Sequence, residues 1–352
     1  MASDDRLRIL SIDGGGIRGL LPALVIADIE RRLEEAGGKK RPLSDWFHLL
    51  AGTSTGGLIA LGMAAPGEAC MNGEKLVALY RDEGRSIFRF TPQRVRSLGG
   101  WIAPKHAPAQ LERVLEGHLK SARLAQATRD VVITAYDMTE REPHFFKRWR
   151  AREDESRNPT LVDAAMATAA APTYFPSHQI AGSALVDGGV FAANPTIAAI
   201  SEALKRTTDE PAPVHPHDLF VVSLGTGVRE SGFPPRRVRG WGKIGWILPR
   251  NGESALLGAV FDGQSDAADH WAHMLLNHEP DRRSPEKLDL GRGPRYFRLQ
   301  TTLPRMLALD DASKRSLAEL EAAARRLIAD NASELDVIAE HLLSVGPVSG
   351  EP

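Results

Sequence analysis

The order of apolar and polar residues along the chain predicts strands and helices in turn. Leu7 to Ile12 is a short apolar run typical of a buried strand, and after a glycine cluster the apolar positions from Leu20 to Leu33 recur at helical spacing. The same order returns where Phe47 to Ala51 is followed by Gly-Thr-Ser-Thr-Gly-Gly and by the small, apolar segment Leu58 to Ala65. Further strands are predicted at Val131–Tyr136, Ala184–Val186 and Leu219–Leu224. Because strands that alternate with helices form parallel sheets covered on both faces, we expect an α/β fold with a mostly parallel central sheet.

The length of 352 residues suits one large domain, since α/β folds often absorb such lengths in a single domain. We expect residues 1–352 to form one domain, with a core at about 7–300 and a helical tail at about 304–345. Helical spacing from Asp311 to Leu343 supports the tail, with a break at Asp330-Asn331. Phe88 to Pro108 is rich in proline, glycine and aromatic residues, which is typical of an irregular lid or of an ordinary surface loop.

Charge excludes one class of partner. The chain has 44 Lys and Arg against 45 Asp and Glu, so its net charge of -1 provides no field that would attract a nucleic acid polymer. A local exception is Arg229 to Arg250, where basic residues alternate with Trp241, Trp246 and Ile247. This stretch indicates either contact with anionic headgroups or a phosphorylated ligand, or solvated charges around a few core anchors.

The location of the protein is expected to be cytoplasmic, with peripheral contact with a membrane. Cys70 is the only cysteine, so an internal disulfide is impossible, as is common in a reducing compartment. The first residues carry acids where a signal peptide would carry basic and apolar residues. No run reaches the ~18 apolar residues that span a bilayer, so we expect lipid to be met at a membrane surface.

Gly52-Thr53-Ser54-Thr55-Gly56 is the sharpest chemical signal. A nucleophile on a tight turn from strand to helix needs flanking glycines to avoid backbone collisions, so Gly52 and Gly56 would form a nucleophile elbow around Ser54. The turn would also place Ser54 at a helix N-terminus, where unpaired N–H groups favour negative charge. A turn rich in Gly, Ser and Thr that has no chemical role is the alternative for this short pattern.

A glycine loop, Asp13-Gly14-Gly15-Gly16-Ile17-Arg18-Gly19, follows the first predicted strand. Its amides at Gly14, Gly15 and Gly16 are candidates for an oxyanion hole, and Arg18 would fix the loop or add positive potential. The loop also fits the dinucleotide fingerprint G-x-G-x-x-G. That fingerprint expects an acid at the end of a second strand about 20 residues later. Residues 34–40 read Glu-Glu-Ala-Gly-Gly-Lys-Lys and end no strand, which favours the oxyanion role.

A third signal is Leu185-Val186-Asp187-Gly188-Gly189, an apolar strand that ends in an acid on a glycine turn. Ligand crevices form at strand ends in open parallel sheets, so Asp187 is a candidate to face Ser54 across such a crevice. An Asp-Gly pair is also common as a simple turn.

In combination, these three blocks and their order resemble the signature blocks of patatin-like phospholipases, specifically bacterial, soluble members. The resemblance extends to Ala170–Pro176, Phe191–Pro195, Ser223–Gly227 and, more loosely, Asp262–Asp266, and so covers roughly Leu7 to Gln300. It implies a three-layer α/β/α fold. It also implies a phospholipase, that is, a lipid acyl hydrolase that degrades membrane phospholipids. The implied catalytic group is a Ser-Asp dyad of Ser54 and Asp187, which would act through an acyl-enzyme with no metal and no organic cofactor.

Several alternatives remain open from the residues. A Ser-His-Asp esterase would use Ser54, Asp187 and a later histidine, His215, His217 or His270. The histidine pairs His215/His217 and His270/His273 suggest metal binding only weakly, because no third ligand follows at a recognisable spacing.

Regulation is a further hypothesis. Some bacterial proteins similar to this one are phospholipase effectors activated by cyclic dinucleotides in antiviral (antiphage) defence, and the basic, aromatic stretch Arg229 to Arg250 is the feature that motivates a cyclic dinucleotide activator here. A nucleotide-binding regulatory protein with the hydrolase fold is the non-catalytic alternative. The sequence leaves a homo-oligomer open.

Overall fold

A computed structural model describes residues 7–37, 39–88, 103–206, 213–229, 232–247, 254–277, 295–305 and 307–348. An eight-stranded sheet lies at its centre, with seven strands in the order β5, β6, β3, β2, β1, β7, β9 and with β4 paired to β3. The strands are β1 (Leu7–Ile12), β2 (Leu49–Thr53), β3 (Asp130–Asp137), β4 (Glu142–Lys147), β5 (His178–Ile180), β6 (Ser183–Asp187), β7 (Leu219–Leu224) and β9 (Tyr296–Leu299). A separate parallel pair joins β8 (Val228–Arg229) to β10 (Thr302–Leu303).

The middle of the sheet is parallel, as the alternation of strands and helices predicts. β3, β2, β1, β7 and β9 run parallel to their neighbours. At one side the direction changes, because β4 and β6 are antiparallel to β3 and β5 is antiparallel to β6. The strand that ends in Asp187 is therefore antiparallel, which differs from the parallel strand end expected for that residue.

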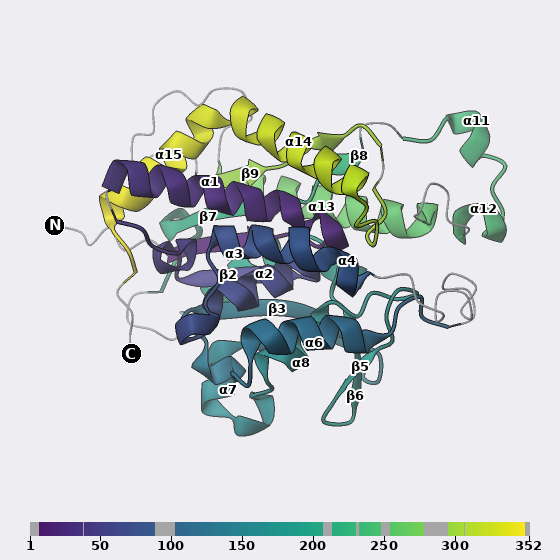
Figure 1. The fold of residues 1–352 in the computed structure, drawn as a ribbon, viewed down its shortest axis with the longest axis horizontal. Helices are drawn as coiled ribbons and strands as arrows, with labels where there is room; N and C mark the ends of the chain where they lie inside the picture. The colour runs from purple at the N-terminus through teal and green to yellow at the C-terminus, as the bar shows by residue number, and fades with distance from the viewer. Residues whose placement is uncertain are drawn as a thin grey trace.

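Helices cover both faces of the sheet, and this confirms the three-layer α/β/α fold (Figure 1). Alternate residues of β1 divide between two apolar clusters: Leu10 and Ile12 belong to the larger one, and Ile9 belongs to the other. The larger cluster packs under α1 (Leu20–Gly37), α2 (Thr55–Ala64), α3 (Gly73–Ala78), α6 (Pro108–Leu119), α8 (Leu161–Thr168), α14 (Lys314–Asp330) and α15 (Ala332–Val345). The smaller cluster packs under α10 (Thr196–Arg206) and α13 (Ala255–Leu276).

The tail forms two helices that lie along α1 (Figure 1). The expected break is found, since α14 ends at Asp330 and α15 begins at Ala332. Between them, the Asn331 side-chain amide donates to the Leu327 carbonyl at 2.8 Å. This bond satisfies a carbonyl at the end of α14 and marks the break.

The remaining short helices are α4 (Gly84–Ile87), α7 (Arg148–Glu153), α9 (Gly189–Ala192), α11 (Pro235–Val238) and α12 (Lys243–Ile247). Most of the segment predicted to be a lid or a surface loop, residues 89–102, lies outside the described residues, as do residues 230–231 and 248–250 of the basic, aromatic stretch. Within the described ranges, no helix has both the length and the apolar character needed to cross a bilayer.

Candidate active site

Ser54 lies at the turn between β2 and α2, with φ 54° and ψ −123°. Such a conformation is rare for a residue with a side chain and costs about 1–3 kcal/mol, so the surroundings must hold it in place. The backbone N–H of Ser54 donates to Thr168 Oγ1 at 2.8 Å, and the Leu58 N–H donates to the Ser54 carbonyl at 3.0 Å. The turn that the sequence predicts is thus present, with the strained residue at the position of the predicted nucleophile.

The two glycines that flank this turn are required by space. A Cβ atom on Gly52 would lie 2.2 Å from the carbonyl oxygen of Gly56, and a Cβ on Gly56 would lie 2.1 Å from the carbonyl oxygen of Ile12. Both contacts are with backbone atoms, which cannot rotate away. The close approach of strand to helix within the turn depends on Gly52, and the packing of the turn against β1 depends on Gly56.

The register of the sheet brings Ser54 and Asp187 to the same level. On β3, Thr134 is opposite Thr53 of β2, and the next residue, Ala135, is opposite Asp187 of β6. Ser54 follows Thr53 directly, so the two candidate residues lie on either side of β3 near the same point. The two side chains line the same pocket, and the Ser54 hydroxyl is near enough to the Asp187 carboxyl to lower its pKa.

Asp187 is a buried carboxyl with few partners. Its side chain accepts a hydrogen bond from the Gly189 N–H at 2.7 Å, and the residue is 3% exposed. Burial raises the pKa of Asp187 to about 6, although the Ser54 hydroxyl and the Gly189 N–H act in the opposite direction. A carboxylate with a raised pKa is a stronger base than an ordinary aspartate.

The glycine loop lies next to Ser54. The Gly14 N–H, a predicted oxyanion donor, already donates to the Ala193 carbonyl at 2.9 Å, so it is not available to an oxyanion in this conformation. The amides of Gly15 and Gly16 donate to no acceptor in the part of the chain that the structure describes. These two remain the donors that the loop offers.

Arg18 holds the loop from within the protein. Its guanidinium donates to the Gly15 carbonyl at 3.3 Å and to the Gly227 carbonyl at 3.2 Å, and the side chain is buried. Of the two roles that the sequence leaves open for Arg18, these contacts favour fixing the loop.

Sequence reasoning missed the partner of Asp13, the first residue of the loop. Arg298 on β9 donates to Asp13 from both terminal nitrogens, and Ser265 on α13 donates to Asp13 at 3.2 Å. Burial raises the pKa of Asp13, while the guanidinium of Arg298 acts against that rise. The Ser265 contact accounts for the Asp262–Asp266 block, but a single arginine in a four-residue strand gives no signal in the sequence.

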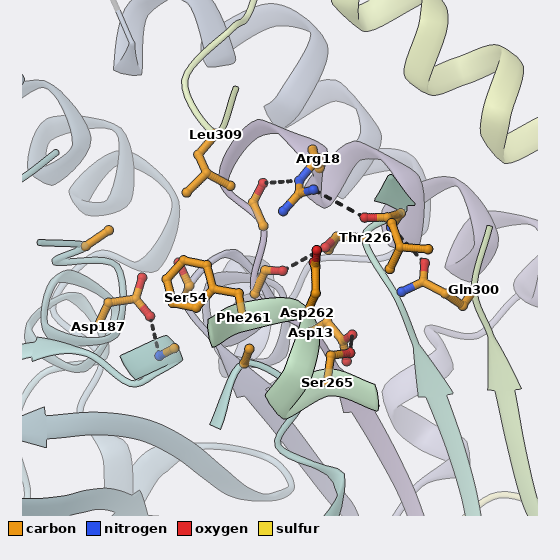
Figure 2. Close-up of a pocket in the computed structure, with 17 residues that line it drawn as sticks. Asp13, Arg18, Ser54, Asp187, Thr226, Phe261, Asp262, Ser265, Gln300 and Leu309 are labelled. Atoms are coloured by element: carbon orange, nitrogen blue, oxygen red, sulfur yellow. Dashed lines mark hydrogen bonds between the residues drawn. The ribbon is translucent and has the colours of Figure 1, made fainter. Parts of the chain in front are cut away.

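Two pockets meet at Ser54. The first, the more polar of the two, has a volume of about 520 Å³; Figure 2 shows Ser54 and Asp187 on one side of it, with Phe261 and Asp262 of α13 nearby. It is also lined by Asp13, Gly14, Gly15, Arg18, Thr226, Ser265 and Gln300. The second, of about 550 Å³, is lined mainly by apolar side chains, which include Ile17, Leu58, Ile87, Phe88, Leu111 and Phe175, and it also reaches Gly16.

The histidines of the alternative scheme lie elsewhere. His215 and His217 stack on each other beside a short turn before β7, with ring centroids 5.4 Å apart. His270 is exposed on α13, and none of the three lines either pocket. Among the described residues, no group of three His, Cys, Asp or Glu side chains is arranged to hold a metal ion.

Several known proteins are similar to this chain. A family model described as Patatin-like phospholipase matches residues 10–200. The chain is 33% identical to Patatin-like protein 2 of Arabidopsis thaliana, over 74% of this chain and 70% of that protein. It is 32% identical to Patatin-like protein 1 of Oryza sativa subsp. indica, over 96% of this chain and 84% of that protein.

Two further matches are less informative about activity. The chain is 29% identical to a protein of Solanum tuberosum named Probable inactive patatin-3-Kuras 1, over 70% of each chain. Among solved structures, VipD from Legionella pneumophila matches with a TM-score of 0.43 and 11% identity, over 93% of this chain and 67% of that chain, which is too low a similarity to bear on function.

Proposed function

Since the chain belongs to the patatin-like phospholipase family, we propose that it is a lipid acyl hydrolase that cleaves fatty-acyl esters of phospholipids, with Ser54 as nucleophile and Asp187 as base. The observation that carries this proposal is the position of Ser54, on a strained turn where two pockets meet and beside the buried Asp187 carboxyl, whose pKa the Ser54 hydroxyl lowers.

In the first half of the proposed reaction, Asp187 takes the hydroxyl proton of Ser54 while Ser54 Oγ attacks the ester carbonyl. The tetrahedral intermediate then collapses, the alcohol half of the lipid leaves with the proton from Asp187, and an acyl-enzyme remains. In the second half, Asp187 takes a proton from water, whose oxygen attacks the acyl-enzyme, and the proton returns to Ser54 as the fatty acid leaves. Each proposed step uses protein groups and water alone.

The raised pKa of Asp187 supports this role. An ordinary carboxylate is a weak base for a serine hydroxyl, and a pKa of about 6 reduces the mismatch. Burial causes the rise, so the same burial that makes the carboxylate basic also keeps bulk water away from it.

The developing oxyanion is assigned to the Gly15 and Gly16 amides, with Arg18 holding their loop. Each such donor typically contributes about 3 kcal/mol of transition-state stabilisation. Gly15 is also fixed by space, because a Cβ there would lie 2.4 Å from Thr226 Oγ1, whose hydroxyl donates to the Gly14 carbonyl.

The two pockets suit the two halves of a phospholipid. The apolar pocket would take the acyl chain, since it is lined by side chains such as Leu58 and Leu111 and opens at Ser54. The polar pocket would take the alcohol half, beside Asp262 and Gln300.

The decisive experiment compares the wild-type protein with Ser54→Ala and Asp187→Asn on vesicles of mixed phospholipids, with released lipids identified by mass spectrometry. We expect fatty acid and lysolipid from the wild type and at least about a thousandfold less from either variant. Ser201→Ala, on the exposed face of α10, is the matched control and should behave as the wild type. Equal product from the wild type and Ser54→Ala would refute the proposal.

The triad alternative is tested with the histidines. If a Ser-His-Asp triad operated, replacing its histidine with alanine would remove the base and most of the activity. We expect His215→Ala, His217→Ala and His270→Ala each to keep most of the wild-type hydrolysis, because none of these residues lines the site. Loss of activity in one of them would favour the triad.

Activation by a cyclic dinucleotide in antiphage defence stays a prediction, motivated by the basic residues of α11 and α12. The test is to titrate the protein with cyclic dinucleotides and to measure both binding and vesicle hydrolysis. Hydrolysis stimulated by the nucleotide would support a signalling effector. Binding of the nucleotide without stimulated hydrolysis would not. Whether the protein is a homo-oligomer also stays a prediction, which sedimentation analysis would answer.

A further inference from the structure

The segment between β8 and α13 carries a local excess of positive charge. Residues 231–252 contain five basic residues and no Asp or Glu, although the whole chain has a net charge of -1. Four of the five lie in the described part of α11 and α12 or between them, and their side chains are exposed: Arg236, Arg237, Arg239 and Lys243. None of these four forms an ion pair with a described acidic residue. Within the described part of the chain, their charge is therefore not neutralised by an ion pair.

A row of aromatic side chains supports these basic residues. The Arg229 guanidinium lies 4.7 Å from the centre of the Phe233 ring, and the Phe233 ring meets Trp241 edge to face at 4.9 Å. Trp241 meets Trp246 edge to face at 5.4 Å. All three aromatic residues and Arg229 are partly buried, while Arg236, Arg237 and Arg239 are exposed. The aromatic row therefore gives the segment a small core of its own, with the basic side chains outside it.

Apolar side chains are exposed beside the basic ones. Ile247 at the end of α12 is 49% exposed, and Leu256 and Val260, one helical turn apart on α13, are 45% and 38% exposed. α12 packs against α13, so the three residues belong to neighbouring elements. We call these three residues with Arg236, Arg237, Arg239 and Lys243 the α11–α13 surface. Leaving such side chains in water is unfavourable unless a partner covers them.

The α11–α13 surface adjoins the candidate active site. Val260 is followed on α13 by Phe261 and Asp262, which line the polar pocket. Figure 1 shows α11 and α12 outside the three layers, at one end of the molecule. A partner on this surface would therefore lie beside the entrance for the alcohol half of a lipid.

We propose that the α11–α13 surface docks on an anionic lipid bilayer and so presents the pocket at Ser54 to its substrate. The inference rests on the proposed function, to which it adds the surface that meets the membrane. Exposed Ile and Leu side chains flanked by Arg and Lys are the combination that binds at a bilayer interface, with the apolar residues inserted and the basic residues at anionic headgroups. Neither pocket at Ser54 is lined by Arg236, Arg237 or Lys243, so these cations are placed for an extended surface.

The test measures binding to phosphatidylcholine vesicles with and without phosphatidylglycerol, together with hydrolysis of the vesicles and of a water-soluble ester, nitrophenyl butyrate. We expect the wild type to bind the anionic vesicles and to be released by high salt. Arg236→Glu/Arg237→Glu should weaken this binding by at least about 30-fold, since each basic residue near an anionic surface contributes about fivefold. Ile247→Ser/Leu256→Ser should also weaken it, by roughly tenfold.

Arg325→Glu/Arg326→Glu is the matched control, because it makes the same change in charge at two exposed arginines on α14. This control should bind and cleave anionic vesicles as the wild type does, and all variants should keep hydrolysis of the soluble ester. Equal binding of the wild type to neutral and anionic vesicles, or equal loss in the α11 and α14 variants, would overturn the proposed surface. If the wild type itself did not hydrolyse the soluble ester, the proposed function would be refuted, but the result on vesicle binding would still stand.

Discussion

Arg298 and Asp13 form a buried ion pair that joins the end of the sheet to the glycine loop. Arg298 Nη1 lies 2.9 Å from Asp13 Oδ1, and Arg298 Nη2 lies 2.5 Å from Asp13 Oδ2. The same guanidinium donates to Ser223 and Ser265, so β7, β9 and α13 all meet at this point. Because Gly14 and Gly15 follow Asp13 directly, the pair fixes the start of the loop to which the oxyanion is assigned.

Replacing Arg298 with methionine should therefore reduce both stability and activity. A buried pair that loses one partner leaves an uncompensated charge, which costs about 3–5 kcal/mol. We expect a loss of this size in urea unfolding and a fall in kcat with a smaller change in KM on nitrophenyl butyrate, because the proposed role of the loop is to stabilise the transition state. Arg315→Met is the control, since Arg315 is 79% exposed in its pair with Glu319 and should cost less than about 1 kcal/mol. Similar losses in both variants would show that the Asp13 pair has no special role.

The pH dependence should report Asp187. Its pKa of about 6 lies above the ordinary value of 3.8, so the proposed base would be protonated and inactive in mild acid. We expect kcat/KM for nitrophenyl butyrate to fall about tenfold per pH unit below pH 6 and to level off above it. A profile that stays flat down to about pH 4 would exclude this carboxylate as the base.

The raised pKa of Asp187 also predicts how the stability of the fold changes with pH. The change has the opposite sign to that caused by most aspartates. A raised folded-state pKa favours the protonated carboxyl, so folding is favoured in acid and this contribution is lost as the pH rises through about 6. Asp187→Asn should then be more stable than the wild type at about pH 8, by about 3 kcal/mol, and about equal to it near pH 4. Urea unfolding at both values measures the difference. Greater stability of the wild type at the higher pH would contradict the assigned cause.

The sequence predicts the parts of the fold that depend on local pattern. β1 and β7 match their apolar runs, and the break in the tail falls at Asn331 as predicted, because each is set by residues close in the chain. The short strands β4, β5 and β9 were not predicted. β4 and β5 have only partly apolar faces, and β9 is four residues long, so their pairing is decided by neighbours distant in sequence.

In the candidate site, too, features set by neighbouring residues could be predicted, and features set by distant residues could not. The turn at Ser54 could be predicted, since the glycines that it needs are adjacent to it. The strand end made Asp187 a candidate to face Ser54, but their pairing as a dyad was inferred only from a family resemblance, because it depends on the register of β3 with two other strands. The engagement of the Gly14 amide by Ala193 could not be predicted, since it depends on where α9 ends in space.

Alanine at the two elbow glycines should damage the turn. Gly52→Ala or Gly56→Ala would force a Cβ to within about 2 Å of a backbone carbonyl, so the strand and helix would have to separate. Overpacking of this kind costs about 1–3 kcal/mol and should displace Ser54 enough to lower kcat at least about tenfold. Gly117→Ala is the control, because Gly117 is exposed on α6 with no atom near its added Cβ, and this change should stabilise the helix by up to about 1 kcal/mol. Normal kcat in the Gly52 and Gly56 variants would contradict a tightly constrained elbow.

The assignment of the apolar pocket to the acyl chain can be tested by filling it. Leu111 on α6 lines that pocket, and Leu115, one turn further along the same helix, is similarly buried but lines neither pocket. Leu111→Trp should shorten the space for the chain, so that long acyl groups lose contacts while short ones still fit. Because each buried methylene contributes about 0.8 kcal/mol, exclusion of two methylenes would lower the ratio of kcat/KM for nitrophenyl laurate to that for nitrophenyl butyrate by about tenfold. Leu115→Trp is the control, because it carries a comparable packing cost and should leave this ratio unchanged. If the ratio fell equally in both variants, or in neither, the acyl chain would bind elsewhere.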